Sequence, residues 1–185
     1  CLTGRLDIKN GNARLGGIGL TAKQLQKIPH VRLLGCGTAL NASQVGRIVI
    51  EELARVPTLA HVSSEFRHNN PVIETNALHF AVSQSGETAD TLAAVKEIQL
   101  KGGEVRGVIN VVGSTIARQC GRGCYIHSGP EQSVASTKAF SNMVAALSLF
   151  GIQIGRARTL SRDKGKSLVK SLQKIPNLVA DYLEA

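Results

Sequence analysis

Between residues 31 and 150, short runs of aliphatic residues alternate with longer stretches that have helical patterns. Buried strands are expected at 31–35, 58–62, 78–82, 105–110 and 124–127. Helices are expected between and after them, at 38–55, 63–68, 87–101, 114–119 and 135–150. Strands joined by helical crossovers pair in parallel, so the sequence predicts the α/β class. The expected architecture is a three-layer αβα sandwich around a five-stranded parallel sheet.

The composition agrees with such a sheet. Hydrophobic residues make up 43% of the 185, yet the aromatic residues are only four Phe and two Tyr. An aliphatic core suits strands that are buried on both faces. The scarcity of aromatic rings also leaves few platforms on which single-stranded bases could stack.

The formal net charge of +9 lies at the two ends of the chain, because residues 31–150 are close to neutral. Seven basic residues between Arg156 and Lys174 could form a nucleic-acid stripe, but such a run is more typical of a solvated helix face. The longest apolar stretch, Met143 to Ile154, is well short of the roughly 20 residues that a bilayer requires. Residues 1–15 lack the apolar segment of a signal peptide. We therefore expect a cytoplasmic protein with neither a nucleic-acid nor a membrane partner.

Three segments are expected along the chain. Residues 1–30 form a polar arm with a helix from about Thr21 to Lys27, and residues 31–152 form the α/β domain. Residues 153–185 form a basic connecting helix that contains Pro176. The only methionine is Met143, which favours an interior fragment of a longer protein or a processed product.

The cysteines and histidines do not have the spacing of a metal site. Structural zinc sites need four ligands, commonly in two tight pairs, whereas Cys120 and Cys124 have no second pair. We expect reduced thiols, no metal and no cofactor. Cys1 could serve as an amidotransferase nucleophile, but no glutaminase domain follows it, so a fragment boundary is favoured.

Glycine and small hydroxyl residues follow several of the expected strands. The turns are Gly35–Ala39, Ser83–Thr88 and Ser133–Lys138, with a less distinctive fourth at Val112–Thr115. Unpaired N–H groups and the positive end of the helix dipole make such a helix start an anion cradle. Simple N-capping is the alternative. Four polar side chains at Ser83–Thr88 exceed what a cap requires, so a phosphate site is favoured there.

Two nucleotide-binding motifs are not supported. Leu40 stands where a dinucleotide fingerprint beginning at Gly35 needs its third glycine. The second strand ends in Ala60-His61-Val62, with no acidic residue at the place where the fingerprint needs one. The sequence also contains no G-x-x-x-x-G-K-[ST] motif.

Three runs together resemble a known family: Gly35–Thr38, Ser83–Leu92 and Val134–Phe140. They are similar to the sugar isomerase (SIS) domain, and most specifically to the glutamine–fructose-6-phosphate aminotransferase (isomerizing), or glucosamine-6-phosphate synthase, family. That resemblance implies a flavodoxin-like strand order. Members have a glutaminase domain followed by two SIS domains. The chain resembles the first SIS domain with the helix that leads to the second.

The resemblance implies a role in hexosamine biosynthesis, where the family converts fructose 6-phosphate to glucosamine 6-phosphate. It implies substrate-binding roles for Thr38, Ala39, Ser83, Gln84, Ser85, Thr88, Val134 and Ser136, with Glu131 in support. The family's catalytic residues come from the second SIS domain and the C-terminal tail, so we assign no catalytic residue here. We expect the chain to bind sugar phosphate without converting it. Its expected partners are the second SIS domain, the glutaminase domain and a second copy in a homodimer.

Two departures from the family pattern bear on the site. Ala39 stands where the family commonly has Ser, and Gln132-Ser133 replaces Ile-Gly. Two other functions remain open: a sugar-phosphate sensor and a stand-alone SIS isomerase or deglycase.

Overall fold

The structure is a computed structural model that describes residues 1–184. Its centre is a five-stranded sheet in the order β4-β3-β5-β6-β7. All neighbouring strands are parallel. The strands are β3 (Val31–Gly35), β4 (Thr58–Val62), β5 (Leu78–Ser83), β6 (Val105–Ile109) and β7 (Gly123–Tyr125). This is the flavodoxin-like order, in which the first strand lies between the second and the third, so the predicted class and topology are confirmed.

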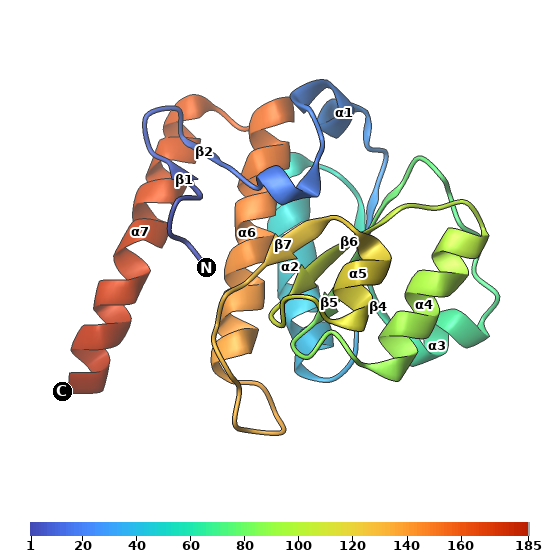
Figure 1. The fold of residues 1–185 in the computed structure, drawn as a ribbon. Coiled ribbons are helices and arrows are strands. Elements are labelled where there is room, and N and C mark those ends of the chain that lie inside the picture. The colour runs from blue at the N-terminus through green and yellow to red at the C-terminus, as the bar shows by residue number, and fades with distance from the viewer. Residues whose placement is uncertain (185) are drawn as a thin grey trace.

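Helices cover both faces of the sheet and complete the three layers (Figure 1). The larger core cluster lies under α2 (Thr38–Ala54) and α6 (Lys138–Arg158), where Phe80 of β5 packs edge-on against Phe150. The smaller cluster lies under α3 (Ser63–His68), α4 (Ala89–Leu100) and α5 (Thr115–Cys120). All residues of β5 and β6 are buried, as aliphatic strands between two helical layers should be.

Most element boundaries agree with the sequence, and one helix corrects it. α1 (Ala22–Lys27) begins at a capping box between Thr21 and Gln24, as its N-cap residue predicts. The last long helix of the domain was expected at 135–150, but α6 begins three residues later and runs on to Arg158. Apolar residues such as Ile152 and Ile154 remain buried against the core and carry the helix past the expected end.

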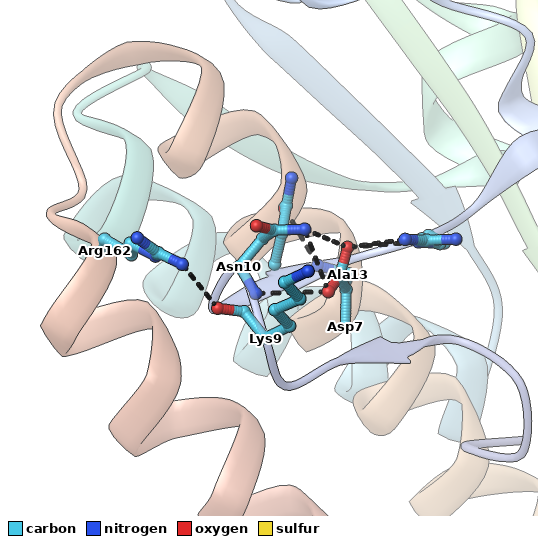
Figure 2. A network of polar contacts seen from close by, with 7 residues as sticks. Asp7, Lys9, Asn10, Ala13 and Arg162 are labelled. Atoms are coloured by element: carbon cyan, nitrogen blue, oxygen red, sulfur yellow. Dashed lines mark hydrogen bonds and ion pairs between the residues drawn. The ribbon is translucent and has the colours of Figure 1, made fainter.

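The first sixteen residues are more than a polar arm. They contain a two-stranded antiparallel hairpin, β1 (Leu6–Asp7) and β2 (Asn12–Ala13), which is followed by a short 3₁₀ helix, η1 (Gly16–Ile18). The Asp7 carboxylate accepts hydrogen bonds from the Asn10 backbone and side chain and closes the hairpin turn (Figure 2). Two-residue strands carry no readable periodicity, which is why the sequence did not reveal them.

The hairpin holds the start of α7 (Arg162–Glu184). The Arg162 guanidinium donates to the Lys9 carbonyl at 2.9 Å, a contact that joins the two segments in Figure 2. Gly165 approaches the hairpin so closely that a Cβ there would lie 2.1 Å from the Gly11 carbonyl oxygen.

Beyond this junction α7 leaves the body of the molecule (Figure 1). Val169 is buried and Leu172 packs partly against the core, whereas every residue from Gln173 to Glu184 is exposed. The exposed part includes the large apolar side chains of Ile175, Leu178, Val179, Tyr182 and Leu183. Within residues 1–184, no helix has the length and hydropathy to cross a membrane.

Candidate functional site

The turns predicted to bind phosphate meet where the strand order reverses. β3 lies between β4 and β5, so the chain leaves β3 in one direction and returns to its other side as β5. Ligands of open α/β sheets bind at this switch point, outside the carboxyl ends of the strands. α2 begins after β3 and α4 begins after β5, and Cys36 Sγ lies 3.8 Å from Thr91 Oγ1 between the two turns.

The turn after β5 is built around two serine hydroxyls. Ser83 Oγ is buried, accepts a hydrogen bond from Gly86 N at 3.0 Å and lies 3.3 Å from Thr88 Oγ1. Ser85 Oγ is half-buried and accepts from Glu87 N at 3.1 Å. Gly86 has φ +66°, and a Cβ there would lie 1.9 Å from Ser114 Oγ. Only glycine allows this tight turn, which fixes the hydroxyls beside the start of α4.

The N-termini of α2 and α4 carry no side-chain caps. The N-cap of α2 is Gly37, which has no side chain to offer, and the Thr88 hydroxyl faces Ser83 instead of capping α4. N-capping is therefore not the role of Thr88 in this structure. No side chain of the N-cap residue balances either helix start, where the helix dipole favours an anion.

Ala39 has no hydroxyl, so its backbone N–H is the only donor that it could offer to a phosphate. In the structure Ala39 is buried and its N–H donates to the Cys36 carbonyl at 3.2 Å.

The other two helix starts are occupied by carboxylates. Glu87 accepts from Thr115 N at 2.8 Å at the start of α5. Glu131 accepts from Thr137 N and Ala139 N, at 3.1 and 3.0 Å, at the start of α6. These backbone hydrogen bonds hold the pKa of both carboxyl groups below the usual range. A fixed negative charge at each start disfavours a second anion, so the Val112–Thr115 and Ser133–Lys138 turns suit a phosphate less well than the starts of α2 and α4 do.

The eight predicted site residues divide into two groups. Thr38, Ala39 and the four residues of the β5–α4 turn lie at neighbouring strand ends. Val134 and Ser136 lie on the loop between β7 and α6, which projects away from the sheet (Figure 1). Val134 is fully exposed there. Because α6 begins at Lys138, both residues lie ahead of the helix rather than within its first turn.

A pocket of about 440 Å³ adjoins the β5–α4 turn, and it is lined by Gln84, Asn110, Val111, His127, Gly129 and Pro130. Asn110 is buried at the end of β6 and fixes the far wall, because its side chain bonds both the Gly129 carbonyl and Ser128 N at 2.8 Å. Sequence reasoning did not assign His127 to a site, since it treated the five histidines as scattered. Its position directly after a strand end was the available signal.

No lysine or arginine lines this pocket. A smaller pocket of about 210 Å³ lies beside β7 and includes Arg122, but no uncapped helix start of α2 or α4 reaches it. Within the described residues, no three His, Cys, Asp or Glu side chains are placed to share a metal ion.

Comparisons with known proteins agree with this fold. The SIS domain model matches residues 24–153. The chain is 44% identical to a glutamine–fructose-6-phosphate aminotransferase of Symbiobacterium thermophilum over 183 residues and 40% identical to that of Chlorobaculum tepidum. These alignments cover 98% and 99% of the chain, but the chain spans only 30% of either relative.

A solved structure gives the same result. The C-terminal domain of glucosamine-fructose-6-phosphate aminotransferase from Francisella tularensis superposes with a TM-score of 0.88 and 29% identity. It covers 99% of this chain, and the chain covers 51% of it. The chain therefore belongs to the SIS domain family and is homologous to the isomerase part of the glutamine–fructose-6-phosphate aminotransferases.

Proposed function

We propose that this chain binds the phosphate group of fructose 6-phosphate or glucosamine 6-phosphate, as the first SIS domain of an aminotransferase of hexosamine biosynthesis. The pair of uncapped helix starts at the switch point carries the proposal. Neutral N–H groups and hydroxyls at such a site suit a phosphate ester. They donate hydrogen bonds to its oxygens and have no charge of their own for another anion to neutralise.

The hydroxyl groups of Ser83, Ser85 and Thr88 are proposed to donate to the phosphate oxygens. Gln84 extends from the same turn into the pocket, where it would meet the sugar. Val134 and Ser136 are proposed to contact the sugar from the β7–α6 loop. We propose no catalytic residue in the chain, because no acid–base pair faces the pocket.

The chain spans 30% of the length of its relatives, which leaves room for further domains. The family resemblance supports a second SIS domain and a glutaminase domain as the proposed remainder of the whole protein. The exposed apolar side chains of α7 are proposed to contact a further domain or a second copy. The four cysteines are unpaired, which suits the proposed cytoplasmic location.

Calorimetric titration with fructose 6-phosphate and glucosamine 6-phosphate tests the proposal, with fructose as the ligand that lacks phosphate. We expect saturable binding of both phosphates and none of fructose. Ser85→Ala should weaken binding about tenfold, because it removes a hydrogen bond to a charged group. Ser161→Ala is the matched control. Like Ser85, Ser161 accepts a hydrogen bond from a backbone N–H, that of Lys164, but it lies after the C-terminus of α6, outside the proposed site.

Ala39→Ser tests the same site by adding a hydroxyl group, whereas Ser85→Ala removes one. The added hydroxyl should restore a donor at the start of α2 and strengthen phosphate binding, by up to about tenfold. Ala42→Ser, at a buried position one turn further along α2, controls for the cost of burying a hydroxyl. Equal binding of fructose and fructose 6-phosphate, or equal affinities of the Ser85→Ala and Ser161→Ala variants, would refute the proposed function.

A further inference from the structure

The turn between β5 and α4 is attached to three successive residues at the start of α5. Thr115 N donates a hydrogen bond to the Glu87 carboxylate at 2.8 Å. Ile116 N donates to the Gly86 carbonyl at 2.9 Å. The Ser114 side chain lies against Gly86, where a Cβ would come within 1.9 Å of its hydroxyl oxygen. The bonded groups of Glu87 and Thr115 are 28 residues apart in the chain, so this attachment belongs to the tertiary structure.

The start of α5 makes this contact in place of an ordinary side-chain cap. Ser114 is the N-cap residue of α5, but its hydroxyl makes no cap hydrogen bond. The residue is buried, and within residues 1–184 its hydroxyl has no hydrogen-bond partner. An N-cap serine ordinarily accepts from the second or third N–H group of its helix. Here the second of these groups, Ile116 N, is bound to the β5–α4 turn instead.

The Glu87 carboxylate carries a negative charge in this turn. Its hydrogen bond with Thr115 lowers the pKa of the carboxyl group, so it stays ionised at neutral pH. Arg118 of α5 contributes to the same shift, and its guanidinium also bonds the Gly113 carbonyl and Thr115 Oγ1. A carboxylate beside a bound phosphate would oppose binding by Coulomb repulsion. Attraction of the ligand is therefore not the role of Glu87, whereas its bond to α5 gives it a role in the shape of the turn.

We propose that Glu87 is a positioning residue of the β5–α4 turn, whose bond to Thr115 N holds Ser85 and Thr88 in the arrangement that binds phosphate. The inference rests on the proposed function and names a residue that does not itself touch the ligand. Glu87 lies directly before Thr88, and its own N–H donates to Ser85 Oγ at 3.1 Å. A displaced Glu87 would therefore move both hydroxyl groups, and a binding site tolerates little movement of its donors.

Two variants remove the same hydrogen bond from its two sides. Glu87→Ala removes the acceptor together with the negative charge, whereas Thr115→Pro removes the donor and leaves the charge. Proline is favoured at the first position of a helix. Ser114 before it has φ −62° and ψ 163°, which suits a residue that precedes proline. Glu87→Gln keeps an oxygen acceptor without the charge and tests for rescue.

Each protein is to be titrated calorimetrically with fructose 6-phosphate and with inorganic phosphate. We expect Glu87→Ala and Thr115→Pro each to weaken binding about three- to tenfold, with the double variant no weaker than the weaker single variant. Repulsion alone predicts the opposite sign for Glu87→Ala, because loss of a negative charge should strengthen the binding of an anion. Glu87→Gln should bind at least as tightly as the wild type.

Glu51→Ala is the matched control. Glu51 also accepts from a distant backbone N–H, that of Thr58 at 3.1 Å, but at the start of β4 and therefore at the amino end of the sheet. It should leave both affinities unchanged. Wild-type affinity or tighter binding in Glu87→Ala or Thr115→Pro, or equal weakening by Glu51→Ala, would overturn the positioning role and leave the proposed function standing. Absence of binding by the wild type would overturn both.

Discussion

At the residue scale, the candidate site depends on whether a side chain is bonded to the first N–H groups of each helix. Glu87 and Glu131 occupy the N-termini of α5 and α6, whereas Gly37 and Thr88 leave those of α2 and α4 uncapped. Four turns with similar sequences therefore differ in the charge that they present. An anion is attracted only where the helix dipole remains unbalanced.

A buried histidine far from the site makes a prediction about pH. His79 of β5 is fully buried, with Nδ1 3.2 Å from the Glu104 carbonyl and with Arg32, His30 and Glu74 as its charged or titratable neighbours. Burial lowers its pKa from 6.5 to about 4. The unfolded chain therefore takes up a proton between these pH values that the folded protein does not, and stability falls as the pH falls.

Urea unfolding at successive pH values should show this loss, which amounts to up to about 3 kcal/mol for the shift of His79. His79→Gln should flatten the decline between pH 6.5 and about pH 4. His68→Gln, at an exposed position, should leave it unchanged. If His79→Gln declined as steeply as the wild type, the acid sensitivity would have to come from another group.

At the element scale, the direction of α7 is set by its contact with the N-terminal hairpin. The contact is between two backbones, because neither Gly11 nor Gly165 has a side chain. A Cβ at Gly165 would lie 2.1 Å from the Gly11 carbonyl oxygen. The sequence predicted the helix but gave no partner for its first turn. The partner lies about 150 positions earlier in the chain, in a segment without regular periodicity.

Gly165→Ala should loosen this junction. Alanine gains about 1 kcal/mol of helix propensity, but the clash with the Gly11 carbonyl costs roughly 1–3 kcal/mol, and a backbone atom cannot rotate away. Amide hydrogen exchange should become faster in the hairpin and in the first turns of α7, with the central sheet unaffected. Ser167→Ala, at an exposed position of the same helix, should not change these rates. Unchanged protection in Gly165→Ala would show that the hairpin does not hold α7.

At the scale of the whole molecule, the second half of α7 has an apolar side that no element within residues 1–184 covers. Ile175, Leu178, Val179, Tyr182 and Leu183 are between 43% and 82% exposed. Their spacing places them along one side of the helix. A contiguous apolar side of this kind marks an interaction surface.

We expect the chain to self-associate through this side of α7. Sedimentation velocity should show a dimer for the wild type and a shift toward monomer for Leu178→Glu, because burial of a carboxylate in an apolar contact is costly. Asn177→Glu introduces the same charge on the opposite side of the helix and should leave the dimer intact. A wild-type chain that stays monomeric at high concentration would contradict this prediction.

The sequence by itself determined the strands and helices of the three-layer fold. The positions of the five strands, the helices between them and the capped start of α1 follow from periodicity and capping residues, which act over a few neighbouring positions. The family resemblance added the strand order and most of the residues of the turn that we propose to bind phosphate. The later start of α6 was not predictable, because it depends on the loop before the helix and on the Glu131 carboxylate that binds its first N–H groups.

Only the tertiary structure decided which of the similar turns keep an uncapped helix start. Glu87 binds a backbone group 28 residues away, and Asn110 fixes a loop 18 and 19 residues away. Through that loop His127 joins the pocket of Gln84, although the two are separated by two helices and two strands. Side chains from distant segments compete for the same N–H and carbonyl groups. The outcome depends on distances in space that local spacing along the chain does not encode.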